Sequence, residues 1–427
     1  MHFRLLVSTI SFLISITLYA EETHTEHDWG LGVVVRTASI PYATDETSVS
    51  SFIPMMFYQD ELFFLNGLEG GIKFFENDDW RFSALSRVRF VDIPEQYQNQ
   101  FKGATADFGL QSRYEVQDDQ YLDLELMQDV DSYKHANLRY SMVFDEGSWE
   151  VEPYAALRYK SADFNRHYYA LEQQAIGGGI DGAVGLRLKY HVTSNLYLLG
   201  SAQTRWLDPN ARATPVVTDN TENEISLGVG FFNDKTERKK KALRISPYIR
   251  AAHGWATPSN LNDILTGNTE KDSYNNQLSS LFYGHPLTDE LFGLPLEIYL
   301  TPGFVWHWSS EVQSSTQEYV LAIKAYYTFE LPVRFRLGVA EGLSYIRDIA
   351  YIEKTELEKK GYEPSNLLNY LDFSLDMHLG DIFGRNLDNF WLGYSIHHRS
   401  AIFESAAHFG RIKGGSNYNS VYLQWHF

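Results

Sequence analysis

The sequence predicts an all-β fold made of transmembrane antiparallel β-barrels, a barrel of about twelve strands followed by an eight-stranded barrel. Three observations carry this prediction. Apolar and polar residues alternate with a period of two through most of the chain, the alternating segments are about ten residues long, and aromatic residues stand at their ends. Segments of about ten residues cross a bilayer at a tilt. The alternative is a secreted soluble β protein, which would hide its apolar face in a core.

The amino-acid composition excludes several classes of function. The 427 residues include 36 Lys and Arg against 55 Asp and Glu, which gives a formal net charge of −19, and no Cys. This acidic balance argues against a nucleic-acid partner, which needs a basic face. Without Cys there is no disulfide scaffold and no Cys-ligated metal centre. Separately, we expect no cofactor and no metal.

The first twenty residues predict a secretory signal peptide, residues 1–20. A basic start at Met1–Arg4 precedes the apolar run Leu5–Leu18, and Ala20 ends a small-residue cleavage site. The run is short for a membrane span, which disfavours the alternative of an N-terminal anchor. We expect an exported protein located in the cell outer membrane of a Gram-negative envelope.

Alternation is clearest in the first half of the chain, which we assign as one barrel over residues 21–232. Four segments each set an apolar face against a charged face: Trp80–Val91, Tyr121–Asp131, Trp149–Lys160 and Ile180–Val192. In a membrane barrel the apolar face meets lipid and the charged face lines the lumen. Glu224–Phe232 alternates in the same way and is expected to close this barrel.

Four carboxylates share one face in this half: Asp123, Glu125, Asp129 and Asp131. Carboxylates are calcium ligands, so a calcium site is one interpretation. We favour the other, in which they pair inside the lumen with the cations Arg81, Arg87 and Arg89.

A basic run over residues 233–243 separates the two halves. It reads NDKTERKKKAL and is the densest basic stretch in an acidic protein. We read it as a linker that is either a solvated periplasmic turn or a contact for acidic partners and lipid phosphates.

The second half, residues 244–427, holds eight segments that predict the eight-stranded barrel. They are Arg244–Trp255, Asn276–Tyr283, Leu296–Trp308, Gln317–Phe329, Arg334–Ile346, Asn366–Leu379, Phe390–Ile402 and Asn417–Phe427. Eight is the smallest even number that closes a membrane barrel. The last strand ends on Phe, which resembles the assembly signal of bacterial outer-membrane barrels. One continuous barrel of about twenty strands is the alternative.

Two details of this half are open to test. Arg334 and Arg336 are expected to face Asp372 and Asp376 across neighbouring strands. Glu341 falls on the apolar face of its strand, and a β-bulge at Ala340–Gly342 is our interpretation of that position.

The first half resembles the MipA/OmpV family of outer-membrane proteins over roughly residues 28–232. The matching stretches are DWGLGVVV, SSFIPMMFYQDELFFLNGLEGGIKFF, YYALEQQAIGGGIDGAVGLRLKYHV, LYLLGSAQTRWLDPNARATPVV and a closing GVGFF. The resemblance implies an outer-membrane barrel that scaffolds a lytic murein transglycosylase and a murein synthase. It implies periplasmic murein enzymes as partners and no catalytic residues.

The second half looks more distantly like the PagL-type lipid A deacylases, through the stretch YSIHHRS. That family uses a His-x-Ser pair, matched by His398 and Ser400, with a catalytic Glu about a dozen residues later. Here Glu404 stands at a different spacing, and Ala401 replaces the expected Asn. The resemblance implies an acyl-ester hydrolase acting on lipopolysaccharide.

Strand parity places this pair at a membrane boundary. His398 and Ser400 continue the apolar face of Leu392, Tyr394 and Ile396, at the outer end of the seventh strand of this half. A serine nucleophile needs an imidazole to take its proton and a third group to orient that imidazole, which is the role Glu404 would fill.

The plainer interpretation is that these are ordinary residues of a wet barrel rim. Arg399, Arg411 and Lys413 would then be solvated, or would bind lipopolysaccharide phosphates. Three functions remain open: a scaffold for murein enzymes, a lipid A hydrolase, and a small-solute pore.

Overall fold

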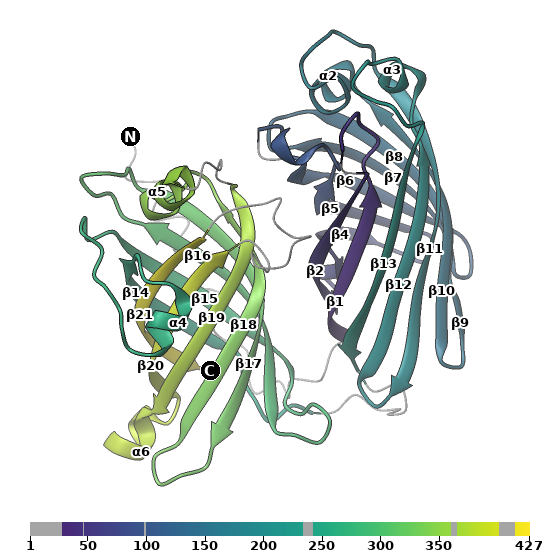
Figure 1. Cartoon of the computed structure of the whole chain (residues 1–427). Coiled ribbons are helices and arrows are strands. Elements are labelled where there is room, and N and C mark those ends of the chain that lie inside the picture. Colours follow the sequence, from purple (N-terminus) through teal and green to yellow (C-terminus); the bar gives the residue numbers. More distant parts are fainter. Residues whose placement is uncertain (1–27, 46, 98–99, 234–241, 360–364, 401–414) are drawn as a thin grey trace, which may run out of the picture.

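The computed structural model describes residues 28–45, 47–97, 100–233, 242–359, 365–400 and 415–427. These residues form two closed antiparallel β-barrels that stand side by side (Figure 1). The prediction of two barrels, about twelve strands followed by eight, is confirmed, and one continuous barrel is excluded. The predicted signal peptide and most of the basic run lie outside the described residues. No described helix has the length and apolar character needed to span a bilayer.

The first barrel is twelve strands around, because two of its thirteen strands, β8 and β9, lie end to end beside β10. Its strands are β1 (Asp28–Ser39), β2 (Ser48–Gln59), β3 (Phe63–Gly67), β4 (Glu69–Glu76), β5 (Trp80–Phe90), β6 (Ala104–Gln117), β7 (Gln120–Asp129), β8 (Lys134–Met142), β9 (Phe144–Glu146), β10 (Trp149–Lys160), β11 (Gly179–Thr193), β12 (Leu196–Trp206) and β13 (Thr221–Phe232). The short β9 continues the line of β8 along β10. The circuit closes because β13 pairs with β1, as the alternation of Glu224–Phe232 predicted.

The second barrel has eight strands. They are β14 (Tyr248–Thr257), β15 (Gln277–Thr288), β16 (Leu296–His307), β17 (Thr316–Phe329), β18 (Phe335–Ile346), β19 (Leu367–His378), β20 (Phe390–Ser400) and β21 (Gly415–His426). It closes because β21 pairs with β14. Closure leaves no row of unpaired backbone groups facing lipid, where each such group would cost several kcal/mol.

The two faces of the strands follow the predicted parity. On β21, Val421, Leu423 and Trp425 are exposed on the outside, whereas Tyr422 and Gln424 are fully buried inside. The outside of the first barrel carries exposed Leu122, Leu124 and Leu126 on β7. Since apolar side chains face outward along both barrels and charged ones face inward, the barrels are transmembrane.

The two ends of the barrels differ, and we name them by their connections. At the turn end, neighbouring strands are joined by short turns, such as the two residues Asp118 and Asp119 between β6 and β7. The loop end carries most of the short helices: η1 (Glu95–Tyr97), α2 (Ala162–Ala170), α3 (Pro209–Arg212), α4 (Leu261–Leu265) and α5 (Tyr351–Lys359). Helices α6 (Leu379–Phe383) and η2 (Arg385–Leu387) lie at the turn end of the second barrel. Short periplasmic turns and longer outer loops are typical of outer-membrane barrels.

A compact apolar cap closes the loop end of the first barrel. Helix α2 begins where the Ser161 hydroxyl accepts a hydrogen bond from the Phe164 N–H, and it ends at Leu171 in a left-handed conformation. Its Phe164, Tyr168 and Tyr169 are almost completely buried in a cluster that draws on α3 and on the loops after β1 and β5. These side chains cover the lumen from the outside.

The barrels touch through their outer surfaces near the turn end. Trp29 and Tyr58 of the first barrel pack with Leu287, Leu291 and Ile298 of the second in one buried cluster. Phe231 and Phe292 add an edge-to-face ring pair whose centroids are 5.4 Å apart. Their positions in the chain gave no sign of this contact.

Two predictions for the second barrel need correction. Arg336 does bind Asp376, at 2.7 Å, but Arg334 lies before β18 and pairs with Asp381 at the turn end. The interpretation of a bulge at Ala340–Gly342 is wrong, because β18 pairs in unbroken register with both neighbours through Glu341. Glu341 is an exposed carboxylate in the middle of the outward face of its strand.

Candidate functional site

The lumen of the second barrel is packed with ion pairs and tyrosines. Asp372 binds Arg250 at 3.0 Å and also contacts the Lys324 ammonium, so it does not pair with the arginines predicted for it. The rings of Tyr326, Tyr370 and Tyr422 are buried among these charges. The arginine planes stack on aromatic rings, as Arg336 does on Trp391 at 3.9 Å. A lumen filled in this way is a structural core.

A buried polar cluster lies toward the loop end of this lumen, and sequence reasoning missed it. The Glu318 carboxylate contacts Nε2 of His307 at 2.7 Å and Nε2 of His397 at 3.2 Å. It also accepts a hydrogen bond from the Ser344 hydroxyl at 2.7 Å. Arg399 donates to Ser344, and these residues all lie on inward-facing positions. The sequence did hold a sign of this cluster, because one Glu, two His and one Arg all occupy inward-facing positions of their strands.

Helix α5 closes this end of the second barrel by sending one carboxylate inward. Glu353 is fully buried, and its Oε2 accepts a hydrogen bond from Arg399 Nη1 at 2.6 Å. Burial raises the pKa of the Glu353 carboxyl to about 7, against the opposing effect of Arg399. Helix α5 thus acts as a cap on this lumen.

The predicted His-x-Ser pair lies on the opposite, outward face of β20. His398 and Ser400 alternate with the inward-facing His397 and Arg399, at the loop end of the strand. Nδ1 of His398 lies 2.5 Å from Oδ1 of Asn417 on β21. Asn417 therefore orients the imidazole, the role that the sequence assigned to Glu404. Glu404, with Arg411 and Lys413, lies outside the described residues.

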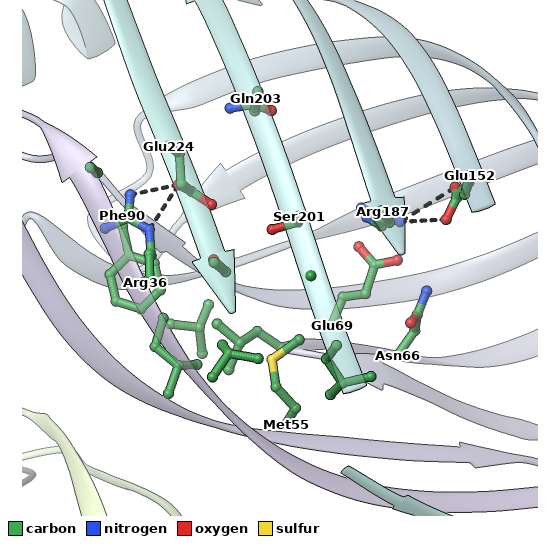
Figure 2. A pocket seen from close by; sticks show the side chains of 18 of the residues that line it. Arg36, Met55, Asn66, Glu69, Phe90, Glu152, Arg187, Ser201, Gln203 and Glu224 are labelled. Atoms are coloured by element: carbon green, nitrogen blue, oxygen red, sulfur yellow. Dashed lines mark hydrogen bonds and ion pairs between the residues drawn. The ribbon is translucent and has the colours of Figure 1, made fainter. Parts of the chain in front are cut away.

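The first barrel differs because its lumen holds a cavity of about 380 Å³. One side of this cavity is apolar and the other is charged (Figure 2). Apolar side chains come from β1, β2 and β12, from the turn between β3 and β4, and from the end of β5: Val34, Ile53, Met55, Phe57, Leu68, Phe90 and Leu199. The charged side comes chiefly from β5, β10, β11, β12 and β13. A second cavity, of about 390 Å³, shares Phe57, Asn66, Glu69 and Lys189 with the first and extends toward the turn end.

Most charges around the first cavity are paired. Arg36 binds Asp92 at 2.6 Å and Glu224 at 2.7 Å, and Arg187 binds Glu152 at 3.2 Å, as Figure 2 shows for Glu224 and Glu152. Arg87 bridges Glu69 and Glu125. These pairs are in a lumen of low dielectric, so each carboxylate needs its cation.

The four carboxylates on the charged face of β7 and beyond are engaged by cations. Glu125 binds Arg87 and Asp129 binds Arg89, which confirms the salt-bridge interpretation for these two. Asp123 instead binds Arg113 and Arg139, two cations that were not among the partners predicted from the sequence. Asp131 lies beyond the strand and binds Lys102, and Arg81 binds Glu76 at the turn end.

One cation on the cavity wall differs from the others. Arg158 on β10 donates through Nε to Asn137 Oδ1 at 2.8 Å. Within the described part of the chain it makes no ion pair with a carboxylate. Asp181, its neighbour across the β10–β11 ladder, is bound by Lys160 at 2.8 Å.

Comparison with known proteins agrees with the architecture of the first barrel. Residues 29–232 match the family model described as MltA-interacting protein MipA. No curated protein sequence matches the chain.

Solved structures give only weak similarities. A bacterial polysaccharide outer membrane secretin is 9% identical, with 94% of this chain and 99% of that chain covered and a TM-score of 0.24. CdiB from Acinetobacter baumannii is 11% identical, with 93% and 60% covered and a TM-score of 0.28. LpxR from Salmonella typhimurium is 8% identical, with 69% and 89% covered and a TM-score of 0.20. At these scores the similarity says nothing about what this chain binds or does.

Proposed function

Residues 29–232, the first barrel, match the family model of MltA-interacting protein MipA, and on that basis we propose that this chain is an outer-membrane scaffold for murein-hydrolysing and murein-synthesising enzymes. This match is the observation that carries the proposal. The name of the family refers to an interaction with MltA rather than to a reaction. The chain is an outer-membrane β-barrel protein, and its turn end faces the periplasm where murein lies.

The shape of the two lumens supports a binding role over conduction. The second lumen is filled by buried side chains, and α2 with its aromatic cluster covers the outer end of the first. A pore for small solutes needs a wide continuous channel, which charged and aromatic interiors of this kind oppose. Surfaces at the turn end are then the parts that a periplasmic partner can reach.

The turn end of the first barrel is strongly acidic. Its short turns and strand ends carry exposed carboxylates that contact water: Glu61, Asp78, Asp79, Asp118, Asp119, Asp145 and Glu146. Concentrated negative charge steers and orients a partner with a basic face. We assign this acidic turn end as the docking surface for the murein enzymes.

Affinity purification from detergent-solubilised envelopes tests the scaffold proposal. The tagged full-length chain is expected to retain a lytic murein transglycosylase and a murein synthase. The variant Asp118→Asn/Asp119→Asn/Asp145→Asn/Glu146→Gln should lose most of this retention, because it removes four charges from the docking surface. Asp163→Asn, which removes an exposed carboxylate of α2 at the loop end, is the control. Retention of neither enzyme by the unaltered chain would overturn the proposal.

A second candidate function is hydrolysis of an acyl ester of lipid A by the second barrel. The observation that favours it is the contact between His398 and Asn417, which orients an imidazole on the same outward strand face as Ser400. In this candidate His398 takes the proton of the Ser400 hydroxyl as it attacks the ester carbonyl.

Mass spectrometry of lipid A from cells expressing the chain tests this candidate. The lipid A should lose one hydroxyacyl chain, and Ser400→Ala should restore the full mass. Ser309→Ala, an exposed serine between β16 and β17, should leave the loss intact. Unchanged lipid A in cells with correctly inserted protein would refute the hydrolase and leave the scaffold untouched.

A further inference from the structure

We propose that the lumen of the first barrel binds a single-chain amphiphilic anion, whose tail enters from the bilayer through a window in the barrel wall and whose head binds Arg158. The window lies between β2 and β5, toward the loop end, where the β3–β4 hairpin is too short to fill the wall. This site is independent of the scaffold role and of the His398–Ser400 pair.

The window follows from the strand pairing. Pairing of β2 with β3 runs from Gln59 only to Met56. The hairpin then turns at Leu68, whose carbonyl accepts the Val88 N–H at 3.0 Å as the last contact with β5. Residues 48–55 of β2 have β1 as a strand neighbour and no described strand on the side facing β5. The other strands of this barrel run the length of the wall, so the gap is local.

The edge of β2 at the window is adapted to lacking a neighbour. The Asp60 N–H bonds to Phe63 across the hairpin, so alternate residues back along β2 direct their N–H groups to the same side. Pro54 occupies one of these positions and has no N–H to satisfy. Proline is tolerated on edge strands for this reason.

Apolar side chains lead from the bilayer to the cavity through this window. Val35 on β1 and Phe108 on β6 are exposed on the outside at either side of it. Phe90 and Val88 lie on the outward parity of β5, yet both line the lumen cavity together with Met55. The Phe90 ring lies under the Arg36 guanidinium, 4.9 Å from its centroid (Figure 2). Ile53, Leu68 and Phe90 belong to one apolar cluster, so apolar side chains pack together where the strand pairing is missing.

Arg158 supplies the anchor for a charged head on the far wall. The other described cations of this cavity bind carboxylates, whereas Arg158 has only the amide oxygen of Asn137. It lies in the same lumen as the cations Arg89 and Arg205, which raises the local positive potential. A cation held away from bulk water without a counter-charge is costly, and an anionic head group offsets that cost.

The volume of the cavity fits a ligand with one acyl chain rather than a whole diacyl lipid. A cavity of about 380 Å³ is within the range of small-ligand sites, about 300 to 1,000 Å³. Its apolar lining is continuous on the β1–β2 side, and its polar groups converge on the opposite side. A fatty carboxylate and a lysophosphatidate share the chemistry required, one acyl chain with one anionic head.

Photo-crosslinking in phosphatidylcholine vesicles tests the site with defined probes. Palmitate carrying a terminal diazirine is expected to label peptides that contain Met55 and Phe90, mapped by mass spectrometry. Arg158→Gln should lower this labelling at least fivefold, and Met55→Trp should lower it by narrowing the window. The matched controls are Arg139→Gln, a lumen cation outside the lining of this cavity whose partner Asp123 keeps Arg113, and Leu124→Trp on the lipid face away from the window. Both controls should label as the unaltered chain does.

Two further probes distinguish binding of the anionic head from binding of the acyl tail, and a carboxylate ligand from a phosphate ligand. The uncharged hexadecanol diazirine should label the lumen weakly and equally in Arg158→Gln and the unaltered chain. A lysophosphatidate that carries a diazirine shows whether the site also binds a phosphate head group. Loss of lumen labelling in Arg158→Gln with either anion supports the site. The proposal is overturned if label appears only on lipid-facing residues, or if Arg158→Gln, shown to be folded by heat-modifiable migration, labels normally with both anions.

Discussion

The hydroxyl of Tyr58 lies 2.9 Å from Nε2 of His285 and joins the two barrels. Because this hydroxyl donates its proton to Asp60 at 2.9 Å, it accepts the bond from His285, whose Nε2 therefore carries hydrogen. The two residues are 227 positions apart in the chain. Around them the buried cluster of Trp29, Leu287 and Leu291 excludes lipid. The barrels thus form one body near the turn end.

This contact predicts a specific cross-link. The chain has no Cys, so Phe231→Cys and Phe292→Cys introduce the only two thiols. We expect a short bifunctional maleimide to link them within the chain in vesicles, because their rings are in contact. The pair Leu124→Cys and Phe292→Cys is the control and should not link. Equal linking of both pairs would show that the barrels move freely.

The buried ion pair of Arg336 and Asp376 predicts a non-additive effect on stability. Arg336→Met should lower the free energy of unfolding by about 3–5 kcal/mol, because Asp376 keeps its charge without a partner. The double variant Arg336→Met/Asp376→Leu should recover most of this loss. Urea unfolding in vesicles, followed by Trp fluorescence, measures both. A double variant as unstable as the single would contradict the argument.

Glu341 predicts a gain in stability on its removal. It is an exposed carboxylate at the middle of the outward face of β18, where lipid surrounds its apolar neighbours Leu337 and Val339. Glu341→Leu should raise the free energy of unfolding by about 1–2 kcal/mol in vesicles, since charges on the lipid face are destabilising near the midplane. Glu330→Leu, in the turn before β18, is the control and should change little. A loss of stability in Glu341→Leu would indicate that the carboxylate has a bound partner.

Glu353 predicts that the docking of α5 depends on pH. Its pKa is raised to about 7 in the docked helix, mainly by burial, so docking favours the protonated carboxyl. The stabilisation is complete below about pH 4.5 and is lost as the pH rises through 7. Hydrogen exchange of α5, corrected for intrinsic rates, should therefore show weaker protection at pH 8 than at pH 5.5. In Glu353→Gln the protection should be independent of pH.

The aromatic cap predicts that the first barrel does not conduct. Single-channel recordings of the unaltered chain should remain at baseline, because Phe164, Tyr168 and Tyr169 cover the loop end. Deletion of residues 163–174 removes these side chains and should produce measurable conductance through the lumen. Steady conductance of the unaltered chain would contradict a closed barrel and revive the small-solute pore.

The sequence by itself determined the architecture, because parity and segment length are local properties. Alternation on Asn417–Phe427 predicted which residues face lipid, and Phe232 and Phe427 each marked the end of a closed circuit. A period of two directs side chains to opposite faces whatever the neighbouring strand is. The same rule placed His398 and Ser400 on the outward face.

Only the tertiary structure decided which charges meet and where strand pairing stops short in the wall of the first barrel. Asp372 binds Arg250 and Lys324 rather than Arg334, because the pairing register and the narrow lumen choose partners across the barrel. The window at β2 and the lone cation Arg158 depend on where a hairpin ends and on which carboxylates are already taken. Such facts depend on the relative positions of residues far apart in the chain, which periodicity within a strand does not encode.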